Sequence, residues 1–457
     1  MGERHKLVLI GAGSTVFTQR LVADLILSGE ADRWQLALVD IDPTTLQAVE
    51  ALVRKMLAFK KASFPIVATT DRRSVLPGAD FVVTTIAVGG RRSWETDIQV
   101  PRRHGIFQPV GDSVMPGGIS RAMRMIPQMV AIAEDVARYC PQAHLLNYGN
   151  PMTAICRAIR RKTGVPVVGL CHGVTYVEGL LAGFLGEEQG SISSFGVGIN
   201  HLTFLTDIRC HGVDVRPRLR AKLEEQLPLM EQEIRDKKDW PNGVSGRAIR
   251  VSDDPLAWSI FAQYGVFPVA MDRHITEFFP ERFPGGHYYG RTLGVDAYPI
   301  DARIALGDTW FDEMLQVARS ADPLPPAYFE NVPGESEQLV QIMYSLLMDR
   351  KQVFSANVPS EGAVPGMPRD AIMEIPAAAC GRGFSPLQCP ALPPALAAKL
   401  LSKLSAVEVT VEAALSGKFD TLVEALLADG TVSEPGDAAR LGRELIEAHG
   451  RNLPQFA

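Results

Sequence analysis

Residues 7–16 read LVLIGAGSTV, an apolar strand followed by a glycine turn and the start of a helix. Gly11 is placed to make the tight turn, and Gly13 lets the backbone approach a pyrophosphate at the N-terminus of the helix. The third glycine of the usual GxGxxG pattern is absent, because Val16 occupies its position. A two-glycine turn alone is a weak signal for dinucleotide binding.

An acidic residue further along the chain strengthens that signal. Asp40 follows the apolar run Leu36–Val39, where a carboxylate at the end of a second strand can bind ribose hydroxyls. An aspartate at this place favours NAD over NADP, because it would repel the extra phosphate. The alternative is a helix-capping turn in an α/β fold that binds no nucleotide. We interpret the following residues as an NAD site: Gly11, Gly13, Ser14, Thr15 and Asp40.

Short β-branched runs alternate with helical patterns over the first two hundred residues. Strands are predicted at residues 6–10, 35–39, 66–70, 81–86, 144–147 and 165–170. Helices are predicted at residues 16–28, 45–59, 119–139 and 152–161, and a polar, arginine-bearing loop precedes residue 118. Such alternation predicts right-handed βαβ units and a parallel sheet with helices on both faces. The predicted fold class is therefore α/β, with a Rossmann-like, doubly wound domain over residues 1–200.

Helical patterns dominate after about residue 200. Helices are predicted at residues 218–237, 309–321, 336–349, 395–415 and 419–427, separated by turns rich in proline and glycine. We expect residues 201–457 to form a mixed α+β, largely helical domain that serves substrate and metal binding and oligomerisation.

The composition of the 457 residues excludes several classes of protein. Hydrophobic residues make up 46% and charged residues 21%, which is not the composition of disordered, collagen-like or coiled-coil chains. The net charge of −6 argues against nucleic acid as a partner, and no apolar run approaches the roughly 18–20 residues of a membrane span. The N-terminus lacks signal-peptide features and the six cysteines are dispersed, so we expect a cytoplasmic protein with reduced thiols.

Two further segments carry residues that can bind a metal. Cys171 and His201 each follow a predicted strand, and ligands gather at the carboxyl ends of strands in open α/β sheets. A thiolate and an imidazole suit a first-row transition metal, with the other positions left to water or substrate. Taken alone, Cys171 is better explained as a small core residue that closes a buried strand.

Other polar residues have two interpretations each. Asn150, in the segment NYGNP, can cap the next helix, contact a sugar or nicotinamide, or do both. Arginines flank the glycine-rich segment 110–118 and either bind an anionic substrate or form a solvated helix face: Arg91, Arg92, Arg102, Arg103, Arg121 and Arg124. The run Asp272-Arg273-His274 is also explained by a buried ion pair.

Taken in order, these segments resemble the glycoside hydrolases of family 4. The resemblance rests on VGDSVMPGG (110–118), NYGNP (147–151), CHG (171–173), GINHLTF (198–204) and YGVFPVAMDRH (264–274). It extends from the glycine turn to about Phe279. It implies a fold like that of lactate and malate dehydrogenases, NAD with manganese or another divalent transition metal, a small-molecule glycoside substrate, and a homodimer or homotetramer.

The resemblance also implies roles for individual residues. Cys171 and His201 would be the metal ligands, and Asn150 would contact the substrate beside the metal. His172 and Asp112 would be the candidate acids at the glycosidic oxygen. Two residues are candidates for the base: Asp272 first, and Tyr264 otherwise.

The chemistry implied by the resemblance differs from hydrolysis by two carboxylates. Removal of a hydride from C3 of the sugar makes a ketone and acidifies the proton on C2, where the metal stabilises the enolate as a Lewis acid. A base takes this proton, the C1 substituent leaves with acid assistance, and water adds back. The hydride then returns to C3, so no net oxidation occurs.

The expected substrate is a uronic acid glycoside, because Cys-His-Gly resembles the members that cleave uronic acids. Arg121 and Arg273 would pair with the uronate carboxylate. We therefore predict an α-glucuronidase or α-galacturonidase. The alternatives are an α-glucosidase or α-galactosidase of the same family, an NAD-dependent 2-hydroxy acid dehydrogenase, and a non-catalytic NAD-binding sensor. Hydride transfer alone has no need of the Cys171 and His201 pair, which argues against the dehydrogenase.

Overall fold

The computed structural model describes residues 4–15, 17–237, 250–330, 332 and 338–456. Its first half contains the parallel strands β1 (His5–Ile10), β2 (Trp34–Val39), β3 (Ile66–Thr69), β4 (Phe81–Thr84), β5 (His144–Asn147) and β6 (Val168–Gly169). They lie in the order β3-β2-β1-β4-β5-β6, so the order reverses between β1 and β4. Ligands of doubly wound sheets bind at such a switch point, and the predicted Rossmann-like fold is confirmed.

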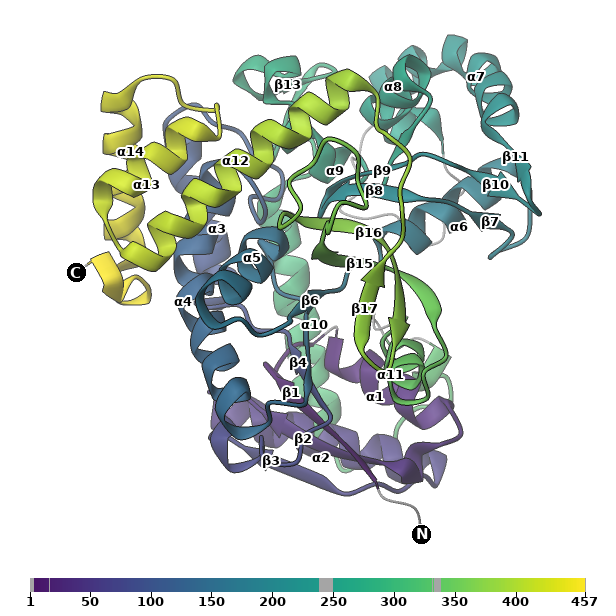
Figure 1. Ribbon diagram of the computed structural model, residues 1–457, viewed down its shortest axis with the longest axis vertical. Helices are drawn as coiled ribbons and strands as arrows, with labels where there is room; N and C mark the ends of the chain where they lie inside the picture. The colour runs from purple at the N-terminus through teal and green to yellow at the C-terminus, as the bar shows by residue number, and fades with distance from the viewer. Residues whose placement is uncertain (1–3, 16, 238–249, 331, 333–337, 457) are drawn as a thin grey trace.

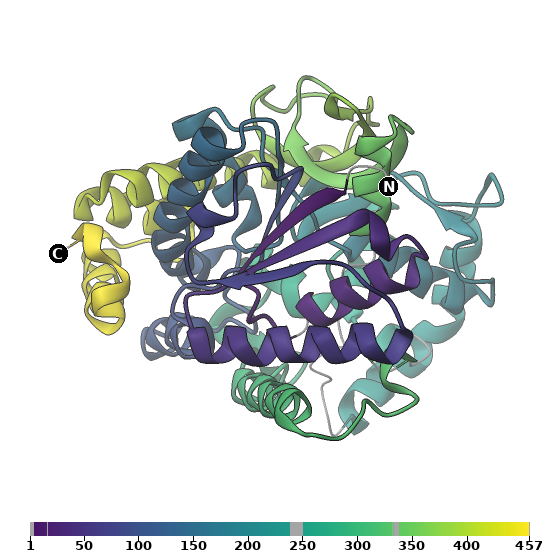
Figure 2. The same cartoon turned by 90° about the horizontal axis from the view of Figure 1, so that it is seen from below.

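Helices cover both faces of this parallel sheet. Leu7 and Leu9 of β1 pack into a core with α1 (Phe17–Leu27) and α2 (Pro43–Lys60), and Figure 2 shows α2 lying along one side of the strands. The alternate residues of β1, Val8 and Ile10, pack with α4 (Met115–Tyr139) and α5 (Met152–Thr163). Because successive strand residues point to opposite faces, a continuous apolar run fills both cores. Val16, the first residue of the predicted helix over 16–28, lies outside the described residues.

Strands from the second half of the chain extend the same sheet. β15 (Gln352–Pro359) pairs with β6 in antiparallel fashion, through Asn357 and Gly169. Beyond it follow β16 (Ile372–Cys380), β8 (Gly196–Ile199), β9 (Leu202–Leu205) and β12 (Phe267–Pro268), and β17 (Gly383–Pro386) pairs with β16. Short strands form two small separate sheets: β7 (Ile192–Ser193), β10 (Arg209–Cys210), β11 (Val213–Asp214), β13 (His287–Tyr288) and β14 (Arg291–Thr292). A domain boundary at residue 200 stays a prediction, since both sides contribute to one sheet.

Helices make up much of the second half, as predicted. They are α7 (Arg216–Asp236), α8 (Pro255–Tyr264), α9 (Asp272–Ile275), α10 (Ile300–Arg319), α11 (Leu339–Leu347), α12 (Pro394–Ser416), α13 (Phe419–Ala428) and α14 (Pro435–His449). Helix α6 (Gly173–Leu185) precedes them. Figure 1 shows α12, α13 and α14, in yellow, beside α3 (Gly90–Arg103), α4 and α5, in blue. The prediction of a helix over 336–349 corresponds to α11, and its residues 336 and 337 lie outside the described residues.

The prediction of a polar loop before residue 118 is wrong over most of its length. Residues Gly90–Arg103 form α3, whose buried face includes Ile98 and Val100. The arginines that suggest a loop lie on the other side of this helix, where Arg91 and Arg92 pair with Asp308 of α10. When hydrophobicity is averaged over all residues of an amphipathic helix with so many charges, the segment resembles a loop. The helix becomes visible only when its buried and exposed faces are considered separately. Among the described residues, no helix is both long and apolar enough to cross a bilayer.

Candidate active site

The glycine turn after β1 lies against the end of β4. Gly11 has a φ of 94°, in the left-handed region that favours glycine. A Cβ atom at this position would lie 2.8 Å from the backbone carbon of Thr85. The amide of Gly11 donates to the carbonyl of Val39, at the end of β2. The turn therefore joins the ends of three neighbouring strands, as a dinucleotide-binding turn requires.

Asp40 lies directly beside this turn. Its Oδ2 accepts a hydrogen bond of 2.7 Å from the amide of Gly13, and its Oδ1 accepts one of 3.1 Å from the amide of Asp42. A Cβ atom on Gly13 would come within 2.8 Å of Oδ2. Gly13 is thus required for the close approach of the turn to the carboxylate that the sequence assigns to ribose binding.

A cavity of 840 Å³ opens over the carboxyl ends of β1, β2 and β4. Its lining includes all five residues that the sequence assigns to NAD: Gly11, Gly13, Ser14, Thr15 and Asp40. Pockets for cofactors typically have volumes of about 300–1,000 Å³. The larger cavity has backbone amides at the start of α1 and the carboxylate that the sequence assigns to ribose binding, and its volume fits a dinucleotide.

A smaller cavity of 280 Å³ adjoins the larger one. The two share Ser14, Thr85, Ile86 and Ala87 in their linings. The smaller cavity is also lined by five residues that the sequence assigns to metal, substrate or acid catalysis: Arg121, Asn150, Cys171, His172 and His201. The structure thus brings these residues to one place beside the dinucleotide turn.

Asp112 is the centre of a polar cluster at this cavity. Asn150 Nδ2 donates to its Oδ2 at 3.0 Å, and Ser113 Oγ donates to its Oδ1 at 2.8 Å. Burial alone would raise the pKa of Asp112, but the facing imidazole of His201, 3.5 Å away, holds it well below its usual value. Asp112 is therefore a carboxylate that attracts cations. As a proton donor it is less suitable than His172, the other candidate acid.

His201 has an unusual backbone conformation. It lies with Asn200 in the tight turn between β8 and β9, and its φ is 67°. A left-handed conformation at a residue other than glycine costs about 1–3 kcal/mol, and such residues cluster at functional sites. Its Nδ1 lies 2.9 Å from Ser113 Oγ. The strained turn thus aims the imidazole at the Asp112 loop.

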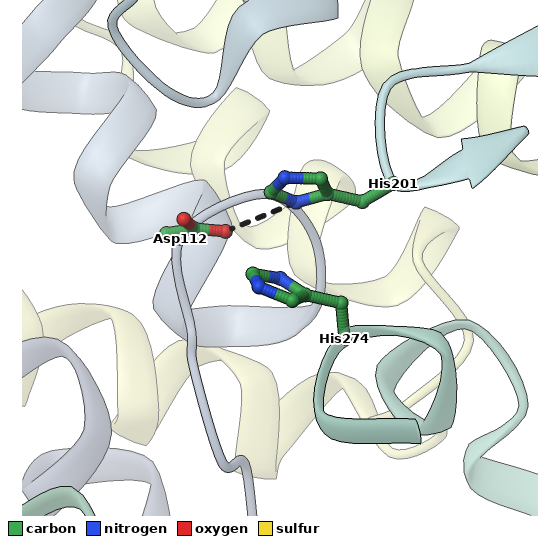
Figure 3. A group of neighbouring side chains, drawn as sticks. All are labelled: Asp112, His201 and His274. Atoms are coloured by element: carbon green, nitrogen blue, oxygen red, sulfur yellow. Dashed lines mark ion pairs between the residues drawn. The ribbon is translucent and has the colours of Figure 1, made fainter. Parts of the chain in front are cut away.

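His274 joins this pair from α9. Figure 3 shows Asp112, His201 and His274 converging from three separate segments of the chain. The two imidazole rings have centroids 4.1 Å apart, and one potential ligand atom from each of the three residues lies within 4.8 Å of the others. In the sequence, His274 stands out only as part of the Asp-Arg-His run. The run does not predict its position at the site, because its neighbours in space, Asp112 and His201, come from distant loops.

The donor atoms around the smaller cavity fit a divalent transition metal. Imidazoles, a carboxylate and the thiol of Cys171 are ligands that such ions accept. Within the part of the chain that the structure describes, Asn150 Oδ1 and both side-chain polar atoms of Asn200 are buried without a hydrogen-bond partner. Buried polar atoms are rarely left unpaired, so a further ligand is expected among them.

The two candidate bases lie beside α8. Asp272 accepts hydrogen bonds of 2.7 Å from the amides of Leu256 and Ala257, and one of 2.5 Å from the hydroxyl of Tyr288. Burial raises the pKa of Asp272 to about 6. Tyr264 is the half-buried last residue of α8. Neither is among the described residues that line the smaller cavity, so the identity of the base stays a prediction.

Glu277 supports the loop that carries Asp112, and the sequence did not single it out. One of its oxygens accepts hydrogen bonds of 2.7 Å from the amides of both Val110 and Gly111, which hold the loop that carries Asp112. Burial raises the pKa of Glu277 to about 8. The sequence does contain a sign of this role. A glutamate within the mainly apolar run Ile275–Phe279 must be either exposed or paired with a hydrogen-bonding partner.

The arginines predicted near residues 110–118 have different roles. Arg121 lines the smaller cavity, and its Nε donates to the carbonyl of Asn150 at 3.0 Å. The others contact protein groups: Arg91 and Arg92 pair with Asp308, Arg102 donates to Gly294, Arg103 pairs with Glu444, and Arg124 pairs with Asp97. Burial lowers the pKa of Arg273 to about 10 in spite of the nearby carboxylates of Asp112 and Glu277. Arg273 is not among the described lining of the smaller cavity.

Asn150 does not cap α5. That helix begins at Met152 with Pro151 at its N-cap and no side-chain cap. The amide of Asn150 is instead directed to Asp112. Of the two interpretations of Asn150, the capping role is therefore wrong.

Two family models cover most of the chain. The one described as Family 4 glycosyl hydrolase matches residues 6–187, and the one described as Family 4 glycosyl hydrolase C-terminal domain matches residues 196–432. An α-galactosidase of Rhizobium meliloti (strain 1021) is 28% identical over 99% of this chain and 90% of its own length. An α-galacturonidase of Thermoanaerobacterium saccharolyticum is 28% identical over 98% of this chain and 96% of its own.

Solved structures share the fold over nearly the whole chain. The putative glucosidase lplD of Bacillus subtilis has a TM-score of 0.80 and 25% identity, with 97% of this chain and 100% of that chain covered. A 6-phospho-α-glucosidase from gut microorganisms, in complex with NAD and Mn²⁺, has a TM-score of 0.82 and 16% identity, with 99% of each chain covered. A malate dehydrogenase of Plasmodium falciparum, 14% identical, has a TM-score of 0.50 over 90% of this chain and 98% of its own, consistent with the expected dehydrogenase-like fold.

Proposed function

This chain belongs to family 4 of the glycosyl hydrolases, and we propose that it cleaves α-linked uronic acid glycosides with NAD and a divalent transition metal bound. Relatives named α-galacturonidase and α-galactosidase match it over nearly its full length at the same 28% identity. The choice between an acidic and a neutral sugar therefore rests on the residues of the site.

Arg121 carries the proposal for an acidic sugar. Its Nε is engaged by Asn150, and within the described residues its two terminal nitrogens make no hydrogen bond. Among the described lining of the smaller cavity it is the one arginine or lysine. A guanidinium with two free terminal nitrogens matches a carboxylate in bidentate geometry.

The cofactor and the metal have separate places in this proposal. Gly11, Gly13 and Asp40 would hold the dinucleotide in the larger cavity. Cys171 and His201 would hold the metal, and Asp112 and His274 supply further donor atoms beside it. When bound, NAD takes up a hydride from C3 while the metal polarises the adjacent oxygens, which acidifies the proton on C2.

Two proton transfers fall to the side chains of this chain. His172 would donate a proton to the leaving oxygen, because it lines the smaller cavity and Asp112 is held as a carboxylate. Asp272 would take the proton from C2, and its pKa of about 6 makes it a stronger base than an exposed aspartate. Its hydrogen bonds to α8 oppose that role, which keeps Tyr264 as the alternative.

The substrate class is tested by comparing an aryl α-galacturonide with the matching aryl α-galactoside on the wild type and on Arg121→Gln. We expect the uronide to be preferred by the wild type. The substitution should lower kcat/KM for the uronide by about 10- to 100-fold, because a charge-assisted hydrogen bond contributes about 1.5–3 kcal/mol. The galactoside should change by much less. The uronide would be excluded in favour of a neutral sugar if the wild type preferred the galactoside and Arg121→Gln lowered kcat/KM equally for both substrates.

A further inference from the structure

The end of the chain reaches the larger cavity. We call residues 450–456 the C-terminal tail; they follow α14 and include the short helical turn Gly450–Asn452. Arg451, Asn452 and Pro454 line the same cavity as the glycine turn. The tail lies beyond residue 432, where the match to the C-terminal family model ends.

Specific contacts hold the C-terminal tail against α3 and α4. Asn452 Nδ2 donates to Ser93 Oγ at 3.2 Å, and Gln455 Nε2 donates to the carbonyl of Met123 at 2.7 Å. Leu453 is only 3% exposed. The tail is thus packed onto the helices that flank the cavity rather than extended into solvent.

A buried charge network fixes the helix that precedes the tail. His449, the last residue of α14, has its Nε2 2.9 Å from Asp97 Oδ1. Arg124 binds both oxygens of Asp97 at 2.6 Å, and its Nε donates to the carbonyl of Val88 at 3.3 Å. Val88 itself lines the larger cavity. Asp97 and Arg124 therefore connect the end of α14 to the loop after β4 through buried hydrogen bonds.

That loop borders the place where a diphosphate is expected, at the glycine turn and the start of α1. Val88–Gly90 follows β4, whose end lies beside the glycine turn at the point where the strand order reverses. Gly89 has a φ of 78°, and a Cβ atom there would lie 3.1 Å from Asn452 Nδ2. The C-terminal tail thus contacts the segment that borders the phosphate-binding end of α1.

Arg451 differs from the other arginines of the larger cavity. Arg72 and Arg73 pair with Asp135, and Arg91 pairs with Asp308. Arg451 is exposed and makes no hydrogen bond or ion pair with any other residue that the structure describes. Its guanidinium is available for an anionic ligand, and its planar donors suit phosphate oxygens.

We propose that the C-terminal tail forms one wall of the dinucleotide site and that Arg451 binds the diphosphate of the cofactor. This inference rests on the proposed function, which places a dinucleotide in the larger cavity. It adds a binding residue from the opposite end of the chain to the glycine turn.

Direct binding measurements test this role without any turnover. The dissociation constants of NAD, ADP-ribose and adenosine are measured by calorimetry for the wild type, Arg451→Gln and Arg451→Lys. NAD and ADP-ribose carry the diphosphate and adenosine does not. We expect Arg451→Gln to weaken both diphosphate ligands by about 5- to 10-fold at low salt and by less at high salt, with adenosine unchanged. Arg451→Lys should retain part of the affinity.

Arg440→Gln is the matched control, because Arg440 is an exposed arginine of α14 outside the cavity. It should bind all three ligands as the wild type does. Wild-type affinity for NAD in Arg451→Gln, or an equal loss for adenosine, would overturn the role of Arg451. A wild type that binds neither NAD nor ADP-ribose would instead refute the dinucleotide site itself.

Discussion

Asp112 and His201, which lines the smaller cavity, face each other with Oδ1 and Nδ1 3.5 Å apart. Asp112 comes from the loop before α4, and His201 from the turn between β8 and β9. Their contact joins the two halves of the chain at the proposed metal site. The negative charge of Asp112 should therefore affect the affinity for a metal cation more than the stability of the fold.

Replacing Asp112 with asparagine tests that consequence. Asp112→Asn keeps the shape of the side chain and removes its negative charge. We expect the affinity for Mn²⁺ to fall by at least about tenfold, with a small change in the melting temperature. The measurement is Mn²⁺ binding followed by electron paramagnetic resonance. Asp308→Asn, which alters a half-exposed surface ion pair, should bind Mn²⁺ as the wild type does. Equal affinity in Asp112→Asn and wild type would contradict the assignment.

Glu277 gives a prediction about pH and stability. Its pKa is about 8 in the folded protein, above the ordinary value of 4.5, so the folded state holds its proton over a pH range where the unfolded state has lost it. Stability from this group is therefore present at low pH and is lost as the pH rises from about 5 to 8. In Glu277→Gln, the side-chain amide oxygen would accept the same two backbone hydrogen bonds without titrating.

The wild type and Glu277→Gln are therefore compared by thermal unfolding across this pH range. The stability of the variant relative to the wild type should increase as the pH rises. Glu281→Gln, at a 56% exposed side chain, should show no such trend. A constant difference between Glu277→Gln and wild type from pH 5 to 8 would show that Glu277 does not titrate there.

The cysteines give a prediction about metal protection. Burial raises the pKa of Cys140 and Cys389 to about 11 and that of Cys156 to about 12, which makes these thiols poor nucleophiles. Cys171 and Cys380 are half-buried. We expect iodoacetamide to label Cys171 and Cys380, and bound Mn²⁺ to slow labelling at Cys171 alone. Mass spectrometry of the labelled peptides gives both rates, and no protection at Cys171 would remove it from the metal ligands.

Asp272 gives a prediction about stability that is independent of its role as a base. Asp272→Asn places an amide group where the carboxylate accepts from two backbone amides at the start of α8. One of these amides would lose its acceptor, so the free energy of unfolding should fall by about 1–3 kcal/mol. Chemical denaturation measures this change. Asp420→Asn, at an exposed position in the first turn of α13, should have little effect, and an equally small effect of Asp272→Asn would contradict the observed capping.

The sequence was informative where structure depends on nearby residues. The apolar strand, the glycine turn and α1 are adjacent in the chain, so their pattern predicts their geometry. Cys171 and His172 could be placed at the site because they follow β6, a parallel strand whose carboxyl end lies at the ligand-binding edge. His201 follows β8, which runs antiparallel to β6 and is separated from it by β15 and β16, so its position at the site did not follow from that rule. The pairing of β15 with β6 could not be found in this way, because Asn357 and Gly169 are far apart in the chain and either strand alone resembles many others.

The same limit applies to the residues that complete the site. His274 and Glu277 are visible as polar residues near or within an apolar run, yet their partners, Asp112 and the amides of Val110 and Gly111, come from a distant loop. A glutamate in such a run is expected to have a partner, but the run does not identify it. Helix α3 was not predicted for a different reason. Its many arginines make the segment polar on average, although one face of the helix is apolar and buried.

The reaction that we propose for this protein is hydrolysis of a uronic acid glycoside through removal of its C2 proton. We would incubate the protein with NAD, Mn²⁺, a reductant and an aryl α-galacturonide or α-glucuronide in deuterated water. We expect release of the aglycone, deuterium at C2 of the freed sugar, and dependence on added NAD with no net NADH. Release of the aglycone without deuterium at C2, or net formation of NADH without cleavage of a glycoside, would contradict it.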